Sequence, residues 1–355
     1  MTSRERVLTA LRRKGKPDRT PFEISWGAFT PGLMATYRKR TGSVLEPAEY
    51  FDFDTRSIEI NPPTRQPNYI KYFSENPSSR IIWDEWCVGS VPGSVEHFVE
   101  YRYHPLARAT TADDVQNFDW PEIDADSRFE GLAEKTAAYH QKGYAVTGEL
   151  YLTIFETAWL LRGLEQLLMD FYANEDLAHA LCENLTTLRI RQAIKFAEDD
   201  VDILRLGDDI SSQKGPIMSV DLYRTYLKER TRRIINAAKS VKPDILIFMH
   251  CDGDVTDFIP EYIDIGIDIL NPVQPECNDL QFLGKQYGDK ISFWGGVGTQ
   301  TTMPFGTPDD VRLKVKEVVA QLGSNGGLLL APTHILEPEV PWENVLAFIE
   351  AARES

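Results

Sequence analysis

The sequence predicts an α/β fold, a (β/α)₈ (TIM) barrel with an N-terminal extension and a β-hairpin near one end. From about residue 126 onward, short apolar segments alternate with longer stretches of helical periodicity, which is typical of parallel βα units. Polar residues follow these apolar segments directly, as they do at the mouth of a barrel. A doubly wound open sheet is the competing architecture. It is disfavoured because no G-x-G-x-x-G run follows the first strand.

Eight apolar segments are the expected strands of this barrel. They cover residues 20–25, 56–60, 144–148, 201–207, 244–250, 267–271, 291–296 and 327–332. The expected helices cover residues 3–13, 127–142, 157–170, 174–198, 219–240, 254–264, 278–287 and 308–323. A single barrel domain is therefore expected over residues 1–355, with the regular βα units over residues 126–355.

The first part of the chain, residues 1–125, is less regular and is dense in Trp, Tyr, Pro and Asp. Residues 81–105 contain two apolar runs separated by the turn-rich sequence GSVPGS at residues 89–94. This pattern predicts a β-hairpin whose turn lies in residues 89–94. We expect the hairpin to lie over one end of the barrel.

The charge and cysteine content exclude several classes of function. The formal charge of −16 over 355 residues disfavours binding to nucleic acid or to an anionic membrane surface. Four cysteines in a chain of this length do not form a disulfide framework, which fits the cytoplasm. The sequence shows no signal peptide and no apolar run long enough for a membrane span.

Polar side chains gather at the carboxyl ends of the predicted strands, where the active sites of parallel barrels form. They are Glu149, Asp208, Asp209, His250, Asp252, Asn271, Gln274, Gln300 and His334, and Gly296 joins them through its backbone. For any one of them, a loop-capping role is an equally good interpretation. Their joint occurrence at equivalent positions favours a functional site.

A metal site is the sharpest of these predictions. His250 and Asp252 are two residues apart, so an extended backbone points both side chains toward the barrel mouth. His334 follows the last strand and can reach the same point, and these three residue types are competent zinc ligands. Cys251 would then point the opposite way, and it becomes a ligand only if the chain bends there. The competing interpretation for each histidine is a structural hydrogen bond.

Carboxylates next to this site are candidates for proton transfer. Asp208 directly follows a strand and is the better catalytic candidate of the Asp208–Asp209 pair, because like charges in one site raise one pKa. The alternative for Asp208 is a helix N-cap. Glu156 is the second catalytic candidate, and an internal ion pair with Arg162 is the alternative for it.

The remaining polar residues are expected to bind substrate. Asn271 and Gln274 are neutral hydrogen-bonding side chains suited to an amide or a carboxylate. Gly296 allows close approach of the backbone to a ligand. Glu149, Asp209 and Gln300 complete this expected set.

Five ordered segments resemble the uroporphyrinogen decarboxylase superfamily, in particular its branch of corrinoid-linked methyltransferases. They are LRLGDDISSQKGPIMSVDLYRTYL, HCDG, IDILNPVQPECNDL, ISFWGGVGTQTTMPFGTPDDV and LLLAPTHILEPEVPWENV. The resemblance covers residues 126–350 well and the first 125 residues loosely. It implies a TIM barrel and, in the methyltransferase branch, a bound zinc ion.

The sequence departs from the zinc pattern of that branch. The resemblance implies a His-x-Cys pair at the positions of His250 and Asp252 and a later Cys near His334. Here an Asp and a His stand in place of the two thiols, and Cys251 comes one residue early. A His/Asp/His set is harder than one with thiolates and favours oxygen ligands and Lewis-acid chemistry. If Cys251 is a ligand instead, the softer chemistry returns.

The sequence also departs from the decarboxylases themselves. The resemblance implies N-terminal arginines, in a run like R-Q-A-G-R-Y, that hold the carboxylates of the substrate. After the first strand this chain reads PFEISWGAFTPGLMATYRKR. Arg38 and Arg40 are expected on a later helix and do not match those positions.

These observations favour a methyltransferase-like enzyme that moves a methyl group from a small O- or N-methylated substrate to a corrinoid. Because the chain has no D-x-H-x-x-G motif, the corrinoid is expected on a partner protein or free in solution. One alternative is a metal-independent decarboxylase similar to uroporphyrinogen decarboxylase, with Asp208 stabilising a protonated intermediate. Another is a ligand-binding barrel without catalysis. A homodimer is plausible from the resemblance alone.

Overall fold

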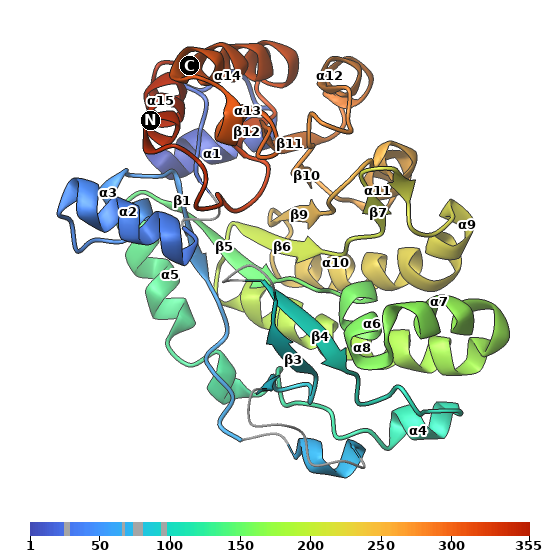
Figure 1. The fold of residues 1–355 in the computed structure, drawn as a ribbon. Helices are drawn as coiled ribbons and strands as arrows, with labels where there is room; N and C mark the ends of the chain where they lie inside the picture. Colours follow the sequence, from blue (N-terminus) through green and yellow to red (C-terminus); the bar gives the residue numbers. More distant parts are fainter. Residues whose placement is uncertain (25–28, 66–67, 74–80, 94–97) are drawn as a thin grey trace.

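A parallel sheet of seven strands curls around the centre of the molecule in the order β1-β5-β6-β9-β10-β11-β12 (Figure 1). The structure is a computed structural model that describes residues 1–24, 29–65, 68–73, 81–93 and 98–355. The strands are β1 (Thr55–Ile58), β5 (Ala145–Leu150), β6 (Ile203–Gly207), β9 (Leu246–His250), β10 (Ile269–Asn271), β11 (Ser292–Val297) and β12 (Leu328–Pro332). Each coincides with a strand predicted from the sequence.

The eighth predicted strand, residues 20–25, is a short bridge between the two edges of this sheet. Phe22 pairs in parallel with Leu330, and the Glu23 N–H donates to the Leu330 carbonyl at 3.1 Å. On the other side, the Asp54 N–H donates to the Phe22 carbonyl at 3.1 Å. The last residue of the predicted strand, Ser25, lies outside the described residues. These pairings join β12 to β1, so the predicted barrel is confirmed, with a reduced eighth strand.

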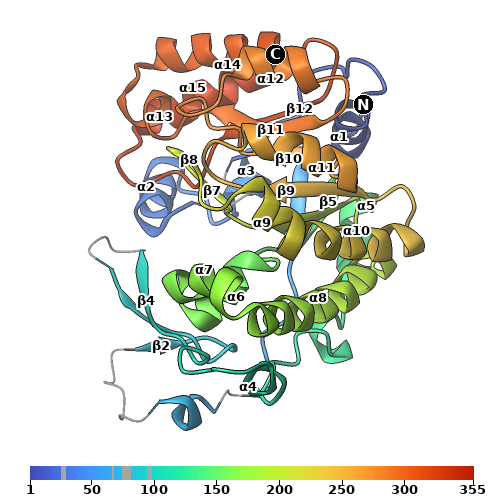
Figure 2. The same ribbon diagram turned by 90° about the vertical axis from the view of Figure 1, so that its right-hand side faces the viewer.

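Helices surround the sheet on its outer side (Figures 1 and 2). Along the barrel they are α5 (Leu132–Gln141), α6 (Phe155–Arg162), α7 (Leu164–Ala173), α8 (Glu175–Glu198), α9 (Val220–Tyr223), α10 (Glu229–Val241), α11 (Ile259–Ile265), α12 (Leu280–Tyr287), α13 (Thr302–Phe305), α14 (Pro308–Leu322) and α15 (Trp342–Arg353). A π-helical segment at Arg224–Lys228 joins α9 to α10, and short 3₁₀ turns lie at Asp126–Arg128 and Thr256–Phe258. In the described part of the chain, no helix is long and apolar enough to cross a membrane.

Helix α1 (Ser3–Leu11) closes the amino-terminal end of the barrel. Its buried Val7 and Leu11 pack against inward-facing residues near the starts of the strands, namely Ala145, Ile203, Leu246, Ile269 and Leu329. Thr2 and Glu5 form a capping box that begins the helix. Because this end is filled with apolar side chains, a ligand has access only at the carboxyl ends of the strands.

The predicted hairpin is a three-stranded antiparallel sheet, and its predicted turn is wrong. The strands are β2 (Ile82–Trp83), β3 (Gly89–Pro92) and β4 (Val99–Tyr103). The first turn comes earlier, because the Asp84 carboxylate accepts the N–H groups of Trp86 and Val88. Residues 89–92, predicted as turn, are therefore strand. Ser94, also predicted as turn, lies outside the described residues.

Several further elements are not predicted by the sequence pattern. They are α3 (Pro47–Tyr50), α4 (Ala112–Gln116), α13, α15, the 3₁₀ turn Tyr69–Tyr72 and the small strand pair β7 (Ser211–Ser212) and β8 (Gly215–Pro216). Helix α2 (Pro31–Thr41) contains Arg38 and Arg40, which are expected on a helix. Helices α2 and α3 both begin with proline, which suits the first turn of a helix but is equally common in irregular chain. The predicted helix 157–170 is two helices, because Gly163 interrupts it at a φ of 90°.

Candidate metal centre at the barrel mouth

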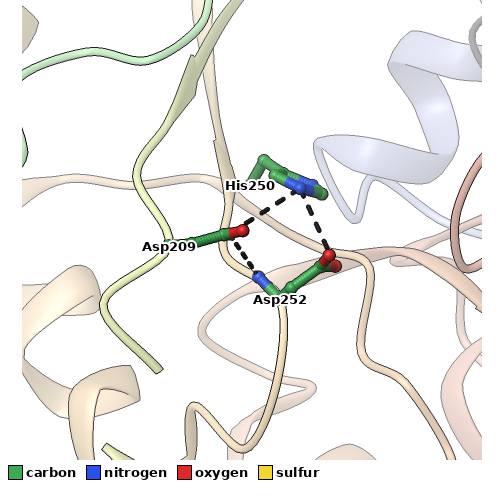
Figure 3. Close-up of side chains that lie close together, drawn as sticks. All are labelled: Asp209, His250 and Asp252. Atoms are coloured by element: carbon green, nitrogen blue, oxygen red, sulfur yellow. Dashed lines mark hydrogen bonds and ion pairs between the residues drawn. The ribbon is translucent and has the colours of Figure 1, made fainter. Parts of the chain in front are cut away.

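Asp209, His250 and Asp252 meet at the carboxyl end of the barrel (Figure 3). His250 Nε2 lies 3.8 Å from Asp209 Oδ1 and 3.7 Å from Asp252 Oδ1. Asp209 Oδ1 also accepts the backbone N–H of Asp252 at 2.7 Å. One ligand atom from each residue lies within 4.8 Å of the others, so the three side chains converge on a common point.

The loops after β6 and β9 bring these residues together. Gly207 and His250 are paired in the sheet, which places the two strand ends side by side. Gly253 then turns the chain at a φ of 89°, and a Cβ there would lie 2.5 Å from the backbone of Ser212. The loop after β9 therefore packs directly on the loop after β6, and this contact returns Asp252 toward Asp209.

His250 is held by the neighbouring strand. Its Nδ1 lies 2.6 Å from Oδ1 of Asn271, the last residue of β10. The Asn271 amide nitrogen donates to the carbonyl of Trp294 on β11 at 2.8 Å. Asn271 is almost fully buried, and both its amide oxygen and its amide nitrogen contact other residues of the protein. The side chain expected to bind substrate is therefore engaged within the barrel.

His334 lies next to this cluster but at its edge. Its Nε2 is 3.9 Å from Asp252 Oδ2, and its ring centroid is 6.4 Å from that of His250. Its side chain is 38% exposed, compared with 14% for His250. The structure therefore brings together His250, Asp252 and His334 as the sequence predicts, with Asp209 taking a more central position than His334.

Cys251 lies on the opposite side of the chain from the cluster. It is buried, and its thiol interacts with Tyr262 and with the backbone of Ile210 and Ser211. Burial raises the pKa of this thiol well above its ordinary value, and the nearby Asp209 adds to the shift. This is the alternation expected for a residue between His250 and Asp252 in extended chain.

Asp208 contacts the start of a helix, whereas Asp209 belongs to the cluster. The Asp208 carboxylate accepts the N–H groups of Ile154, at 2.9 Å, and Glu156, at 3.0 Å, where helix α6 begins. Burial raises its pKa to about 6, against these backbone hydrogen bonds. The helix-capping alternative thus describes the contacts of Asp208, although the helix belongs to the preceding βα unit. Asp209 is left to face His250.

Glu156 lies behind Asp209 on the first turn of α6. Its Oε2 accepts the backbone N–H of Asp209 at 3.2 Å. Burial raises its pKa to about 9, and the charges of Asp209 and Asp208 act in the same direction. Burial also raises the pKa of Asp252, while His250 and His334 oppose the shift. The raised pKa of Glu156 favours a protonated carboxyl group next to the cluster near neutral pH.

The other predicted substrate-binding residues fall into two groups. Gln274 and Gln300 line a cavity beside Asp252, and Gln274 Oε1 accepts the Gly253 N–H at 2.7 Å. Glu149 is paired with Arg205 at 3.0 Å, with both side chains 1% exposed. Gly296 faces helix α14, where a Cβ would lie 2.7 Å from Val318, so it does not line that cavity.

Two cavities open at the barrel mouth. The first, of about 680 Å³, reaches Asp252 and His334 and is bounded on its outer side by Phe98 and Phe305. Among the described residues that line it there is no Lys or Arg. The second, of about 660 Å³, lies over the ends of β1 and β5, beneath the antiparallel sheet, and contains Arg128 and Arg189. Of the three clustered residues, Asp252 lines the first cavity.

The residues present fit a divalent metal ion. Atoms that share a zinc ion at about 2 Å lie roughly 3–4 Å apart, close to the separations of His250 Nε2 from the two carboxylates. Within the described part of the chain, Asp252 Oδ1 is shielded from solvent and has no hydrogen-bond partner. One nitrogen and two oxygen donors make a harder set than one with thiolates.

Comparison with known proteins agrees with this architecture. The family described as uroporphyrinogen decarboxylase (URO-D) matches residues 107–355. The uroporphyrinogen decarboxylase of Chlorobaculum parvum is 22% identical over 186 residues, which cover 52% of this chain and 50% of that protein. The methylated-thiol–coenzyme M methyltransferase of Methanosarcina mazei is 24% identical over 202 residues, covering 57% and 51%. The chain thus spans about half the length of the curated relatives it matches.

A solved structure of a methyltransferase from Methanosarcina mazei has the same fold. It aligns with a TM-score of 0.69 at 18% identity and covers 100% of this chain and 99% of that chain. The match confirms the barrel architecture together with the N-terminal extension. On the family match, which spans more than two thirds of the sequence, the chain belongs to the uroporphyrinogen decarboxylase (URO-D) family.

Proposed function

We propose that this protein is a metal-assisted methyltransferase that removes a methyl group from a small O- or N-methylated substrate and passes it to a corrinoid. The observation that carries the proposal is the convergence of Asp209, His250 and Asp252 beside a cavity of about 680 Å³. That volume suits a small-molecule ligand. Relatives in this family include both decarboxylases and a methyltransferase.

Asp209, His250 and Asp252 would hold the metal ion, with His334 as a fourth group at its edge. A bound zinc ion supplies Lewis-acid polarisation of the heteroatom that carries the methyl group. Two carboxylates and an imidazole favour zinc with oxygen or nitrogen ligands over thiol chemistry. This donor set therefore supports an ether or amine as the methyl donor. Cys251 is not needed in it.

Glu156 would supply the proton that the departing heteroatom needs. In the metal-free protein, burial and the neighbouring carboxylates raise the pKa of its carboxyl group to about 9, which favours the protonated form that can act as an acid. It lies against the backbone of Asp209, at the rear of the cluster. In this proposal Asp208 holds the start of helix α6, and thereby Glu156, in position.

The corrinoid would be carried by a partner protein that docks at the barrel mouth. The chain contains no D-x-H-x-x-G motif of its own. Helix α1 fills the amino-terminal end of the barrel, and both cavities open at the opposite end, the mouth. A partner that delivers the corrinoid would therefore dock at the mouth. We place the reaction in the cytoplasm, in agreement with the four free cysteines.

Decarboxylation of a porphyrinogen is the second candidate, because the family and most of the similar curated proteins carry that name. The charges at the mouth oppose it. Arg128 is paired with Glu85, and Arg189 donates to the carbonyls of Leu152 and Thr153. Both arginines of the described cavity linings are therefore already engaged, and a substrate with many carboxylates would meet mainly acidic side chains.

A single assay separates the two reactions. The zinc-loaded protein is mixed with cob(I)alamin and a panel of methoxylated and N-methylated compounds, and methylcobalamin is followed by its absorption spectrum. We expect methylcobalamin to form with at least one donor and Asp252→Asn to abolish it. In parallel, the protein is incubated with uroporphyrinogen. Release of CO₂ there, without methyl transfer from any donor, would overturn the proposal in favour of the decarboxylase.

A further inference from the structure

Asn271 has both ends of its side-chain amide committed, and this fixes its orientation. A backbone carbonyl only accepts hydrogen bonds, so the group 2.8 Å from the Trp294 carbonyl must be the amide nitrogen. The amide oxygen then faces His250 Nδ1 at 2.6 Å. Because this oxygen only accepts, Nδ1 must carry the hydrogen in that bond.

The anchor of this arrangement is rigid. Trp294 lies in the middle of β11, paired with β12, and is fully buried. Its indole N–H donates to Glu23 Oε1 at 2.9 Å. The next residue, Gly295, lets β10 come close, since a Cβ there would lie 2.2 Å from the Pro272 carbonyl oxygen. Strand β11, which contributes no residue to the cluster of Asp209, His250 and Asp252, thus holds Asn271 in place through the Trp294 carbonyl.

We infer that Asn271 is a positioning residue that holds neutral His250 as the Nδ1–H tautomer. A neutral imidazole carries one hydrogen, so Nε2 is then left with a lone pair. Nε2 is the atom that faces Asp209 and Asp252. This is the form in which a histidine binds a metal ion, and a hydrogen bond to its other nitrogen is the usual way to select it. The purpose of this arrangement, binding of a metal ion by His250, rests on the proposed function. The hydrogen bonds that define the tautomer do not depend on it.

A purely structural role for Asn271 makes a different prediction. Its two hydrogen bonds also tie the ends of β9, β10 and β11 together, so loss of the amide lowers stability under either interpretation. Only the positioning role requires a defined tautomer of His250 in the metal-free protein. The tautomer is therefore the quantity to measure.

The experiment is nitrogen NMR on metal-free protein labelled with ¹⁵N at histidine, with the pH raised until the His250 signals no longer change, so that the neutral ring is observed. Long-range proton–nitrogen correlations distinguish the two tautomers, and His250→Gln identifies the signal. We expect His250 to be Nδ1–H in the wild type and in Asn271→Asp, which keeps an acceptor oxygen for Nδ1 although it loses the donor to the Trp294 carbonyl. In Asn271→Leu we expect this preference to be lost. A wild-type His250 in the Nε2–H form would overturn the inference without any variant.

Asn344→Leu is the matched control. Asn344 is also a buried asparagine, and its amide donates to the carbonyls of Met303 and Gly306. The control removes a comparable pair of hydrogen bonds without touching His250, so the tautomer must stay as in the wild type. If Asn344→Leu changes the tautomer as much as Asn271→Leu does, general loosening of the barrel explains the effect and the inference fails.

Zinc affinity gives the second readout. We expect Asn271→Leu to weaken zinc binding by about 10- to 100-fold, and Asn271→Asp and Asn344→Leu to change it by only a few-fold. If the wild type shows the Nδ1–H tautomer but binds no zinc, the proposed function fails and the positioning role stands. If it binds zinc with the other tautomer, the positioning role fails alone.

Discussion

Cys251 and Asp252 are adjacent, yet their side chains lie on opposite sides of the chain. Because the buried thiol of Cys251 faces Tyr262 while Asp252 faces His250, only the carboxylate can join the cluster without a change of backbone. We predict that Cys251→Ser leaves zinc affinity within a few-fold of the wild type. Asp209→Asn is expected to weaken it by about 10-fold or more.

Competition with a chromophoric chelator measures both affinities. Asp257→Asn is the control, since it removes the same charge from an exposed position a few residues away. A large loss of affinity in Cys251→Ser would show that the thiol is a ligand and would restore the softer chemistry.

Glu149 pairs with Arg205 in the barrel interior, where both side chains are 1% exposed. Removing one member of a buried ion pair leaves the other charge without its compensation, which costs about 3–5 kcal/mol. We predict a loss of this size in the free energy of unfolding for Glu149→Leu, measured with chemical denaturant. A variant as stable as the wild type that binds substrate poorly would instead support the role predicted from the sequence, contact with substrate.

The adjacent residues Asp208 and Asp209 show what the sequence cannot predict about single side chains. The positions of His250, Asp252 and His334 at strand ends follow from apolar periodicity, and the structure brings them close to one another. Which of Asp208 and Asp209 faces the site does not follow from it. That choice depends on the free N–H groups at the start of α6, about 50 residues earlier in the chain, which capture Asp208.

At the scale of elements, Gly295 sets how closely the ends of β10 and β11 approach. A Cβ there would lie 2.2 Å from the Pro272 carbonyl oxygen, at a φ of 131°. We predict that Gly295→Ala lowers the free energy of unfolding by at least about 2 kcal/mol more than Gly131→Ala does. Gly131 also has positive φ, but a Cβ added there would have no atom within 4 Å, so the pair of variants separates crowding from backbone strain. Equal losses in thermal or denaturant unfolding would contradict this explanation.

We predict that Asp84 makes the stability of the antiparallel sheet depend on pH. Burial raises the pKa of its carboxyl group to about 6, against two backbone hydrogen bonds. The folded state therefore binds this proton more tightly than the unfolded state does. The stabilisation is fully present below a pH of about 4 and is lost as the pH rises through about 6.

Hydrogen exchange of the amides in β2, β3 and β4 tests this prediction. In the wild type we expect protection, relative to Asp84→Asn, to decrease between pH 4 and pH 6, roughly the window between the two pKa values. The asparagine keeps an acceptor oxygen for the N–H groups of Trp86 and Val88 but does not titrate. A constant difference between the two proteins across this window would contradict the assignment.

The same sheet shows why some elements differ from their prediction. The Gly- and Pro-rich residues 89–94 predict a turn, whereas the Asp84 carboxylate makes the turn earlier through side-chain hydrogen bonds. Strands with continuous apolar runs, such as β9 and β12, are predicted well because both of their faces are buried. Helices such as α2, with a weak apolar stripe and an initial proline, give little signal.

At the scale of the whole molecule, the alternation of strands and helices is enough to predict the barrel. The order of the strands in the sheet follows their order in the chain, so no topological choice is needed beyond the handedness common to such units. The division of the mouth into two cavities is not predictable from the sequence. Residues of the antiparallel sheet, such as Trp83 and Tyr101, line the second cavity together with residues at the ends of β1 and β5, so its walls come from distant parts of the chain.

The central claim is that Asp209, His250 and Asp252 bind one metal ion at the mouth of the barrel. The most direct measurement is an anomalous difference map, at the zinc absorption edge, from crystals grown with zinc. We predict a single strong peak per chain about 2 Å from His250 Nε2 and from an oxygen of each aspartate. A peak at Cys251 or elsewhere, or no peak at this position in crystals that contain zinc, would contradict the account.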